Sequence, residues 1–284
     1  MRFDIIMWAK NGASTLPSVL SHAKKFLPNE SVHRRIFVDD HSIDASRDIA
    51  ERFHWEIHAN EGGGVAAGVN KAFRLVDCDY FMSIEQDVLI SDKWWASIVP
   101  YMEKPNVAVA QGWRLPEEAQ HVLRRFEEYR LERYKKYDLP IFSIDNTMFK
   151  SSVVKSIGPV PSELRYSGVD TYIYKNVLSR GYRWVTDYDV VSTHLRQGGI
   201  REQINRYYRY GIDTPTLDRY ELSSQSRYIR RGMKSALAIL FFSPIRGLLI
   251  GVTMRCPQIA VYYPLIRLAL LRGYLKSTRY KLQN

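Results

Sequence analysis

The N-terminal part of the chain alternates short, continuously apolar runs with longer stretches in which apolar residues recur at helical spacing. Continuous apolar runs predict strands covered on both faces, because such strands have no solvent side that needs polar residues. The runs predict strands over residues 3–9, 35–40, 55–59, 80–85, 140–150 and 189–199. The periodic stretches predict helices over residues 14–27, 42–53, 64–76, 115–137 and 168–184. This alternation predicts a Rossmann-like α/β fold with a mainly parallel sheet flanked by helices.

Three small residues mark where the predicted helices begin and end. Ser14 and Ser42 are the expected N-caps, because a serine hydroxyl accepts a hydrogen bond from a free amide of the first turn. Gly181 is the expected end of the helix in 168–184, because glycine adopts the left-handed conformation that follows many helices.

The C-terminal third differs from the rest of the chain in charge and in hydropathy. Residues 196–284 hold 16 Lys/Arg and 4 Asp/Glu, so they account for the whole net charge of +11. Two apolar segments, 235–254 and 256–271, lie among these cations. Arginines and prolines interrupt both, and neither offers the roughly 18 uninterrupted apolar residues of a membrane span. We therefore predict an α/β domain over 1–200 and a helical region over 201–284.

The basic, apolar C-terminal region predicts contact with an anionic partner. Cations beside apolar helix faces favour helices that lie in a membrane interface, and their charge favours the anionic cytoplasmic leaflet. The alternatives are a buried helical pair, an oligomer contact or a re-entrant hairpin. Nucleic acid is not an expected partner, because the charges alternate with aliphatic runs and no recognised nucleic-acid motif is present.

Other features point to a reducing compartment. The two cysteines, Cys78 and Cys256, are far apart and fit no metal-binding or disulfide spacing. The N-terminal apolar stretch is too short for the core of a signal peptide. We expect the protein at the cytoplasmic face of a membrane.

Polar and acidic residues follow three of the predicted strands at the point where each strand ends. They occupy positions 10–12, 39–42 and 85–87. Ligands of parallel α/β sheets bind outside the carboxyl ends of the strands. Carboxylates that converge there repel one another unless a cation binds, and a small set of oxygen ligands favours Mg²⁺ or Mn²⁺. The alternative is that the acids cap the helices that follow.

In these segments the chain resembles the family 2 glycosyltransferases, which share the GT-A fold. "VDDHSIDAS" is similar to the family's V-D-D-G-S-x-D-x-[ST], with His41 in the place of the glycine, and "SIEQDV" stands where the family has D-x-D. "VDTYIYKNVLSRGYRW" resembles the helix that begins E-D and ends G-Y-[RK]. The resemblance rests on segments in the family's order, at residues 8–20, 38–46, 83–88, 169–184 and 193–199.

The resemblance implies a nucleotide-sugar donor and Mn²⁺ or Mg²⁺ as cofactor. Asp87 and His194 would bind the metal, and Asp170 would be the general base that deprotonates an acceptor hydroxyl. Donor contacts would come from Ala9, Asn11, Asp39, Asp40, Asn70, Lys71, Glu85, Gln86 and Arg206.

Two further positions depart from the family pattern. Glu85 replaces the first aspartate of D-x-D, which lengthens that side chain by one methylene. Val169 replaces the acid before Asp170, and the loss of this carboxylate predicts a more ordinary pKa for Asp170.

The predicted function is that of an inverting, metal-dependent glycosyltransferase. Its expected acceptor is a hydroxyl of a lipid-linked molecule or a polysaccharide, as in cell-envelope polysaccharide biosynthesis. A polyprenyl-phosphate glycosyltransferase is the alternative, since a phosphate acceptor is already anionic and needs no general base. A third alternative is a non-enzymatic protein that binds anionic surfaces through its basic region.

Overall fold

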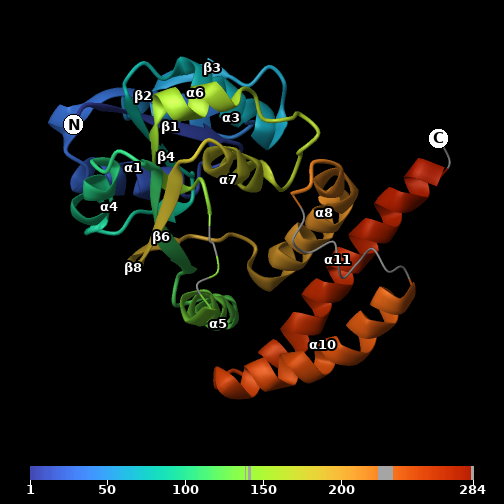
Figure 1. The fold of residues 1–284 in the computed structure, drawn as a ribbon. Helices are drawn as coiled ribbons and strands as arrows, with labels where there is room; N and C mark the ends of the chain where they lie inside the picture. The colour runs from blue at the N-terminus through green and yellow to red at the C-terminus, as the bar shows by residue number, and fades with distance from the viewer. Residues whose placement is uncertain (138, 140–141, 223–232, 283–284) are drawn as a thin grey trace. The chain divides into compact units, whose positions relative to one another are not determined.

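The computed structural model describes residues 1–137, 139, 142–222 and 233–282. The chain forms two compact units. The first unit consists of Met1–Leu115, Pro140–Ser162 and Val169–Leu195, and the second of Pro116–Leu139, Glu163–Gly168 and Arg196–Asn284 (Figure 1). The predicted division near residue 200 stays a prediction.

The first unit is built on a sheet whose strand order is β3-β2-β1-β4-β7-β6-β8-β5. Its strands are β1 (Phe3–Ala9), β2 (Val32–Asp39), β3 (Glu56–Ala59), β4 (Tyr80–Ile84), β5 (Val88–Leu89), β6 (Val107–Pro116), β7 (Asn146–Lys150) and β8 (Arg183–His194). β1 pairs in parallel with β2 and β4, and β2 pairs in parallel with β3. The pairs β4–β7, β6–β7 and β5–β8 are antiparallel.

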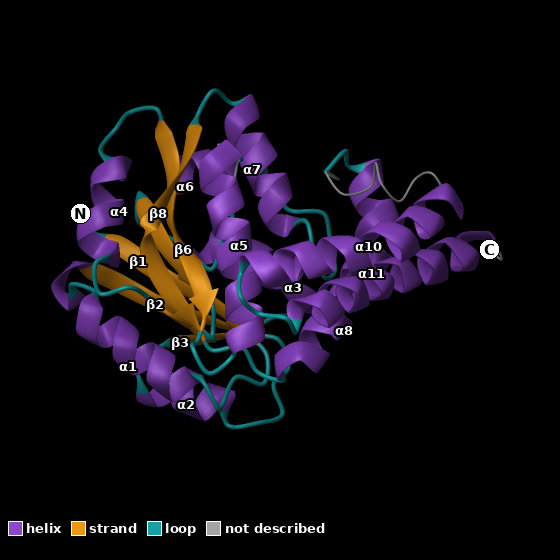
Figure 2. Cartoon of the chain, turned by 90° about the horizontal axis from the view of Figure 1, so that it is seen from below, coloured by secondary structure: helices purple, strands orange, loops and turns teal. Residues whose placement is uncertain are grey.

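Helices cover both faces of this sheet, as Figure 2 shows. They are α1 (Leu16–Phe26), α2 (Ser46–Arg52), α3 (Gly64–Leu75), α4 (Trp94–Met102), α6 (Ser151–Ile157) and α7 (Val169–Ser179). Alternate residues of β1, from Phe3 to Ala9, pack with α1, α2 and α4 in one core cluster. On the other face, Phe73 of α3 contacts Phe81 of β4 and Phe149 of β7. The predicted α/β fold with two-sided burial of its strands is therefore confirmed.

Several predicted boundaries are wrong, and at Ser42 the reason is a tertiary contact. The N-cap of α1 is Thr15, one residue after Ser14. Ser42 lies four residues before α2, and its hydroxyl accepts a hydrogen bond from the Asn11 amide. The strand expected over 140–150 begins only at Asn146, and residues 140–141 lie outside the described residues.

The remaining differences concern the region after β4. The helix expected from 115 begins at His121, because residues 115–116 still belong to β6. The strand expected over 189–199 is β8, which begins at Arg183 and ends at His194. The elements α4, β5, β6 and α6 had no counterpart in the sequence-based prediction. Gly181 was predicted correctly: its φ is 79°, and the amides of Gly181 and Tyr182 bond back to Leu178 and Val177.

The second unit is helical in the residues described. It contains α5 (His121–Tyr137), α8 (Gly199–Arg219), α10 (Met233–Thr253) and α11 (Ile259–Leu282). α11 packs against both α8 and α10, and glycines lie at each contact. A Cβ on Gly211 of α8 would overlap the Leu270 carbonyl, and one on Gly247 of α10 would stand 3.0 Å from the Ala260 carbonyl oxygen. Backbone therefore meets backbone at both contacts.

One face of α10 is apolar and exposed. Its buried positions, such as Ile239, Ser243 and Ile250, recur at helical spacing. The exposed apolar side chains are Leu240, Phe241, Phe242, Ile245, Leu248, Leu249 and Val252, with exposed fractions of 53–72%. Among the described residues, no helix combines the length and the apolar character that crossing a membrane would require.

Candidate functional site

The carboxyl ends of β1, β2, β3 and β4 form one edge of the parallel half of the sheet. The residue that follows each of these strands is polar: Lys10, Asp40, Asn60 and Glu85, respectively. Backbone hydrogen bonds continue from the strands into these positions, from the Asp40 amide to Ala9 and from the Asn60 amide to Asp39. Parallel pairing has therefore gathered the polar strand ends that the sequence indicated.

Asp40 holds the loop that leads into α3. Its Oδ1 accepts hydrogen bonds from the Asn60 side chain at 2.8 Å and from the Gly64 amide at 2.9 Å. Its Oδ2 lies 3.5 Å from the Lys10 ammonium nitrogen. Gly63 and Gly64 have φ values of 63° and 78°, a conformation that glycine adopts without strain. The carboxylate thus fixes the glycine-rich loop beside the edge.

Asp39 supports the turn that follows β2. Its carboxylate is buried and accepts the Ser42 amide at 3.3 Å. His41, between them, has a φ of 58°, in the left-handed region. Glycine, which the family 2 pattern has where His41 stands, would carry no penalty in that region.

At the same edge, hydrogen bonds of Asn11 and Gln86 join the loops that follow β1, β2 and β4. The Asn11 amide donates to the Ser42 hydroxyl, and the Asn11 side-chain oxygen accepts from the Ile43 amide, both at 2.9 Å. Gln86 donates to and accepts from the backbone of Lys10. A Cβ on Gly12 would stand 2.8 Å from the Gln86 side-chain oxygen, so a larger residue there would require the Gln86 side chain to shift. Asn11 and Gln86 therefore shape the edge.

Glu85, Asp87 and His194 form a candidate metal centre. Each offers one ligand atom, and these atoms all lie within 4.8 Å of one another. The Asp87 carboxylate is 3.0 Å from His194 Nε2. Val88 of β5 pairs with His194 of β8, so strand pairing brings His194 beside Asp87, which lies 107 positions earlier in the chain. The two carboxylates suit Mn²⁺ and Mg²⁺, while an imidazole ligand suits Mg²⁺ less well, because Mg²⁺ prefers oxygen.

The sequence model of glycosyl transferase family 2 matches residues 4–158, which is more than half of the chain. The chain belongs to this family. Family membership makes the protein a glycosyltransferase, as its strand-end motifs indicated. A search of curated proteins gives no match.

Solved structures of glycosyltransferases share the fold of this family member. A mannosyltransferase from Pyrobaculum calidifontis, in complex with GDP-Man and Mn²⁺, is 17% identical with a TM-score of 0.70, covering 99% of this chain and 88% of that chain. Glucosyl-3-phosphoglycerate synthase from Mycobacterium tuberculosis, in complex with Mn²⁺, UDP and phosphoglyceric acid, is 14% identical with a TM-score of 0.53. The match covers 71% of this chain and 72% of that chain. TarS 1-349 of S. aureus is 12% identical with a TM-score of 0.54, and the match covers 100% of this chain and 92% of that chain. At these identities the likeness shows the fold alone, which is the GT-A fold.

Asp170, the base expected from the family pattern, lies half-buried in the first turn of α7. Its Oδ1 accepts the Thr171 amide at 2.8 Å. Burial raises the pKa of Asp170 above its usual value, Asp145 adds to the rise, and the Thr171 amide and Arg114 oppose it. The expectation of an ordinary pKa is therefore wrong. Val169 does remove a like charge, but the burial of Asp170 outweighs that loss.

The remaining residues predicted to bind the donor are Ala9, Asn70, Lys71 and Arg206, and each has its own surroundings. Ala9 is the last residue of β1 and is buried. The Asn70 side chain donates to and accepts from the backbone of Val160, both at 2.8 Å. The Lys71 ammonium pairs with Glu61 at 2.9 Å. Arg206 lies on α8 of the second unit. Donor contacts by these residues stay predictions.

Sequence reasoning missed two residues of the first unit, Asp145 and Arg114, whose charges act on Asp170. Asp145 is buried and forms an ion pair with Arg114. Its backbone carbonyl accepts the Glu85 amide at 3.0 Å, which links it to the candidate metal centre. The sequence offered only a weak signal for these two residues. Arg114 is a single cation at the end of an apolar run, and Asp145 is a single acid before another apolar run.

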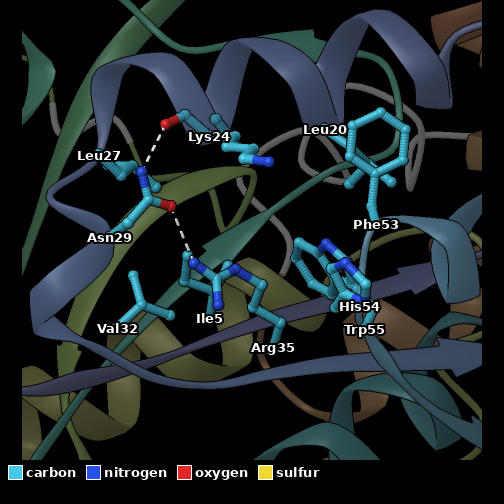
Figure 3. A pocket seen from close by; sticks show the side chains of 11 residues that line it. Ile5, Leu20, Lys24, Leu27, Asn29, Val32, Arg35, Phe53, His54 and Trp55 are labelled. Atoms are coloured by element: carbon cyan, nitrogen blue, oxygen red, sulfur yellow. Dashed lines mark hydrogen bonds between the residues drawn. The ribbon is translucent and has the colours of Figure 1, made fainter.

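A separate cavity of about 450 Å³ lies between α1, the start of β2 and the segment after α2 (Figure 3). It is lined by Ile5, Leu20, Ala23, Lys24, Leu27, Asn29, Val32, Arg35, Phe53, His54 and Trp55. Arg35 donates to Asn29 at 2.9 Å across it. None of the residues predicted for the donor or metal site lines this cavity.

Proposed function

We propose that this family member transfers a sugar from a nucleotide-diphosphate sugar to an acceptor hydroxyl, with inversion of configuration and with Mn²⁺ or Mg²⁺ as cofactor. The observation that carries the proposal is the convergence of Glu85, Asp87 and His194 at the carboxyl edge of the sheet. Two structures of similar fold contain Mn²⁺ with GDP-Man or with UDP, and they support this choice of donor and metal.

Asp87 and His194 hold the metal in this proposal, with Glu85 as the third ligand. When bound, the cation neutralises charge on the leaving diphosphate. Asp39, Asp40, Asn11 and Gln86 shape the neighbouring pocket for the nucleoside. The hydrogen bonds that fix their loops exist before any donor arrives, so little ordering is needed when it binds.

Asp170 acts as the general base. Its carboxylate takes the proton of the acceptor hydroxyl as that oxygen forms a bond to the anomeric carbon of the sugar. The bond from this carbon to the diphosphate oxygen breaks, and its electron pair leaves with the diphosphate. Attack from the opposite side inverts the anomeric centre. The raised pKa of Asp170 makes it a stronger proton acceptor than an ordinary aspartate.

The acceptor is a lipid-linked molecule or a growing glycan, reached at an anionic membrane surface facing the cytoplasm. The exposed apolar face of α10 supports this location. Cations accompany that face and the neighbouring helix at Arg246, Arg255, Arg267, Arg272 and Lys276. Apolar side chains beside cations suit the boundary between acyl chains and anionic headgroups.

A thermal-shift screen of UDP, GDP and other nucleoside diphosphates, with and without Mn²⁺, tests the donor site. One nucleotide should stabilise the wild-type chain in a Mn²⁺-dependent way, and Asp87→Ala should abolish the dependence. Asp92→Ala is a matched control, since Asp92 lies outside the centre. If no nucleotide stabilises the wild-type protein, the donor-site proposal is refuted.

The acceptor and the location need separate measurements. Transfer that survives Asp170→Asn would favour a phosphate acceptor over a hydroxyl, and NMR of the product anomer would establish inversion or retention. Flotation with anionic and with neutral vesicles tests membrane binding, with an RNA-binding assay in parallel. Binding to RNA but not to anionic vesicles would overturn the proposed location.

A further inference from the structure

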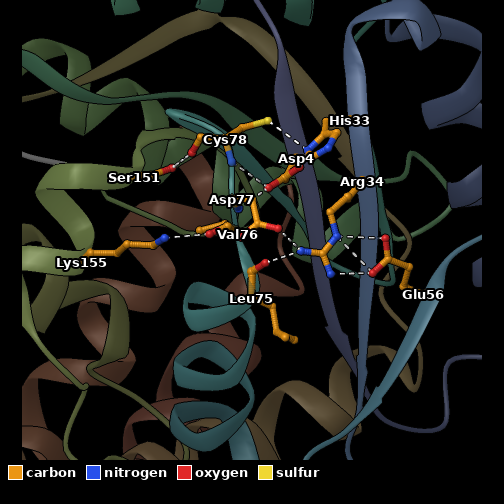
Figure 4. A network of polar contacts seen from close by, with 10 residues as sticks. All are labelled: Asp4, His33, Arg34, Glu56, Leu75, Val76, Asp77, Cys78, Ser151 and Lys155. Carbon is orange, nitrogen blue, oxygen red and sulfur yellow. Dashed lines mark hydrogen bonds and ion pairs between the residues drawn. The ribbon is translucent and has the colours of Figure 1, made fainter.

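A second cluster of ligating side chains lies at the opposite, amino-terminal edge of the sheet (Figure 4). Asp4 comes from β1, His33 from β2, and Cys78 from the loop between α3 and β4. Their ligand atoms all lie within 4.8 Å of one another. His33 Nδ1 is 3.0 Å from Asp4 Oδ1 and 3.3 Å from the Cys78 sulfur.

This arrangement differs from a catalytic triad. In a nucleophile–histidine–acid triad, the nucleophile and the acid contact opposite nitrogens of the imidazole. Here both contact the same nitrogen, Nδ1. Burial raises the pKa of the Cys78 thiol to about 11, and Asp4 adds to the rise, which disfavours a free thiolate nucleophile.

Convergence of three donor atoms on one point is what a bound metal ion requires. In a tetrahedral zinc site, with ligands about 2.0–2.3 Å from the metal, neighbouring ligand atoms lie about 3.3–3.6 Å apart. The observed separations of 3.0 and 3.3 Å are within a few tenths of an ångström of that spacing. Sulfur, nitrogen and carboxylate oxygen are the three ligand types that Zn²⁺ accepts.

Outer contacts already hold the ligands in place. The second carboxylate oxygen of Asp4 accepts the amides of Asp77 and Cys78, at 2.7 and 3.1 Å, which leaves Oδ1 turned toward His33. Arg34 donates to the Leu75 carbonyl and pairs with Asp77. Ser151 and Lys155 donate to the carbonyls of Cys78 and Val76. Such outer-shell bonds orient ligands in metal sites.

We propose that Asp4, His33 and Cys78 form a site for a thiolate-binding divalent cation, and that Zn²⁺ is the ion they fit. The ion joins β1, β2 and the loop before β4. His33 is 29% exposed at its side chain, so solvent reaches the site and water supplies a fourth ligand. The site is independent of the proposed donor site, because it shares no residue with it and lies at the other end of the strands.

Cobalt substitution of the full-length protein tests the proposal, because Co²⁺ bound to a thiolate gives a sulfur-to-metal charge-transfer band. The chelator-treated wild type should show this band with one equivalent of Co²⁺, and Zn²⁺ should remove it. Cys78→Ser should abolish the band. Asp87→Ala and Cys256→Ala are the controls, and both should keep it, since neither residue belongs to the cluster.

His33→Gln provides a second variant at an exposed side chain, should Cys78→Ser fail to fold. It should weaken Zn²⁺ binding by at least about 10–100-fold, the loss that even outer-shell changes cause. The proposal is overturned if the wild type shows no charge-transfer band, if the band survives Cys78→Ser, if Cys256→Ala removes it, or if His33→Gln binds Zn²⁺ as tightly as the wild type.

Discussion

Gly273 of α11 offers a direct test of the close packing in the second unit. A Cβ at this position would overlap the carbonyl oxygen of Tyr208 on α8 and stand 3.0 Å from the Ile212 amide nitrogen. The contact is reciprocal, because a Cβ on Gly211 of α8 would stand 2.9 Å from the Tyr274 nitrogen. Gly273→Ala is therefore predicted to destabilise the unit.

Two terms of opposite sign set the size of the effect. Ordinary Cβ contacts lie at 3.4–4 Å, so the two helices would have to separate by roughly 1 Å to admit a methyl group. Overpacking of this kind costs about 1–3 kcal/mol. Alanine favours the helix over glycine by about 1 kcal/mol. Because backbone atoms cannot avoid the methyl group by a change of rotamer, we expect the upper part of the overpacking cost, about 2–3 kcal/mol, and hence a net loss of about 1–2 kcal/mol.

Urea denaturation followed by circular dichroism measures this loss as a change in the free energy of unfolding. Lys276→Ala is a matched control, since Lys276 is an exposed residue of the same helix, and it should stay within about 0.5 kcal/mol of wild type. If Gly273→Ala instead raises the stability by about 1 kcal/mol, the position behaves as an exposed helical site. That result would refute the contact between α8 and α11.

Three more substitutions test other parts of the chain. Asp170→Asn should lower the transfer rate by about 10²–10⁴-fold while nucleotide binding persists. In the wild type, kcat/KM should fall as the pH drops through the raised pKa of Asp170, at a higher pH than an ordinary aspartate would give, and the pH–rate profile measures this. Asn70→Ala should cost about 1–3 kcal/mol in urea denaturation, because it removes two bonds to the buried Val160, whereas Lys71→Ala should cost less than about 1 kcal/mol. Phe241→Ser should weaken flotation with anionic vesicles without lowering thermal stability, since its side chain is 72% exposed.

The parallel half of the sheet was predictable because its strands are buried on both faces. β1 shows this well: Phe3 and Met7 pack toward α1 and α4, yet Ile6 between them is also fully buried. The run from Ile5 to Ala9, which contains no polar residue, is therefore the direct result of burial on both faces. The antiparallel half gave a weaker signal, because its strands mix apolar residues with buried polar ones such as Gln111 and Asn146. Strands were expected near β7 and β8 with other bounds, and β6 was not expected.

Cap residues were predicted poorly for a physical reason. Serine caps helices through its hydroxyl, but the same hydroxyl can satisfy an amide elsewhere. Ser42 accepts from Asn11, and Ser46, the first residue of α2, accepts from Gly12. Local sequence shows that a hydroxyl is available, and only the folded chain shows which amide it serves.

The two ligand clusters differ in how far sequence could reveal them. Glu85 and Asp87 stand at the end of one apolar run, so their position at the carboxyl edge of the sheet follows from the direction of that strand alone. Asp4, His33 and Cys78 stand near the starts of three elements, and each looks unremarkable by itself. Only the register of β1 with β2, which sets Phe3 opposite Val32, brings Asp4 and His33 side by side. Such pairing is not encoded locally.

The glutamate at position 85 illustrates how the fold absorbs a change in a motif. Its extra methylene would move a carboxylate out of a centre whose backbone was fixed by strand pairing alone. Glu85, however, lies in a turn in which its carbonyl accepts the Val88 amide and its own amide donates to Asp145. Its ligand atom still falls within 4.8 Å of those of Asp87 and His194. The longer side chain is thus compatible with a metal centre at this edge of the sheet.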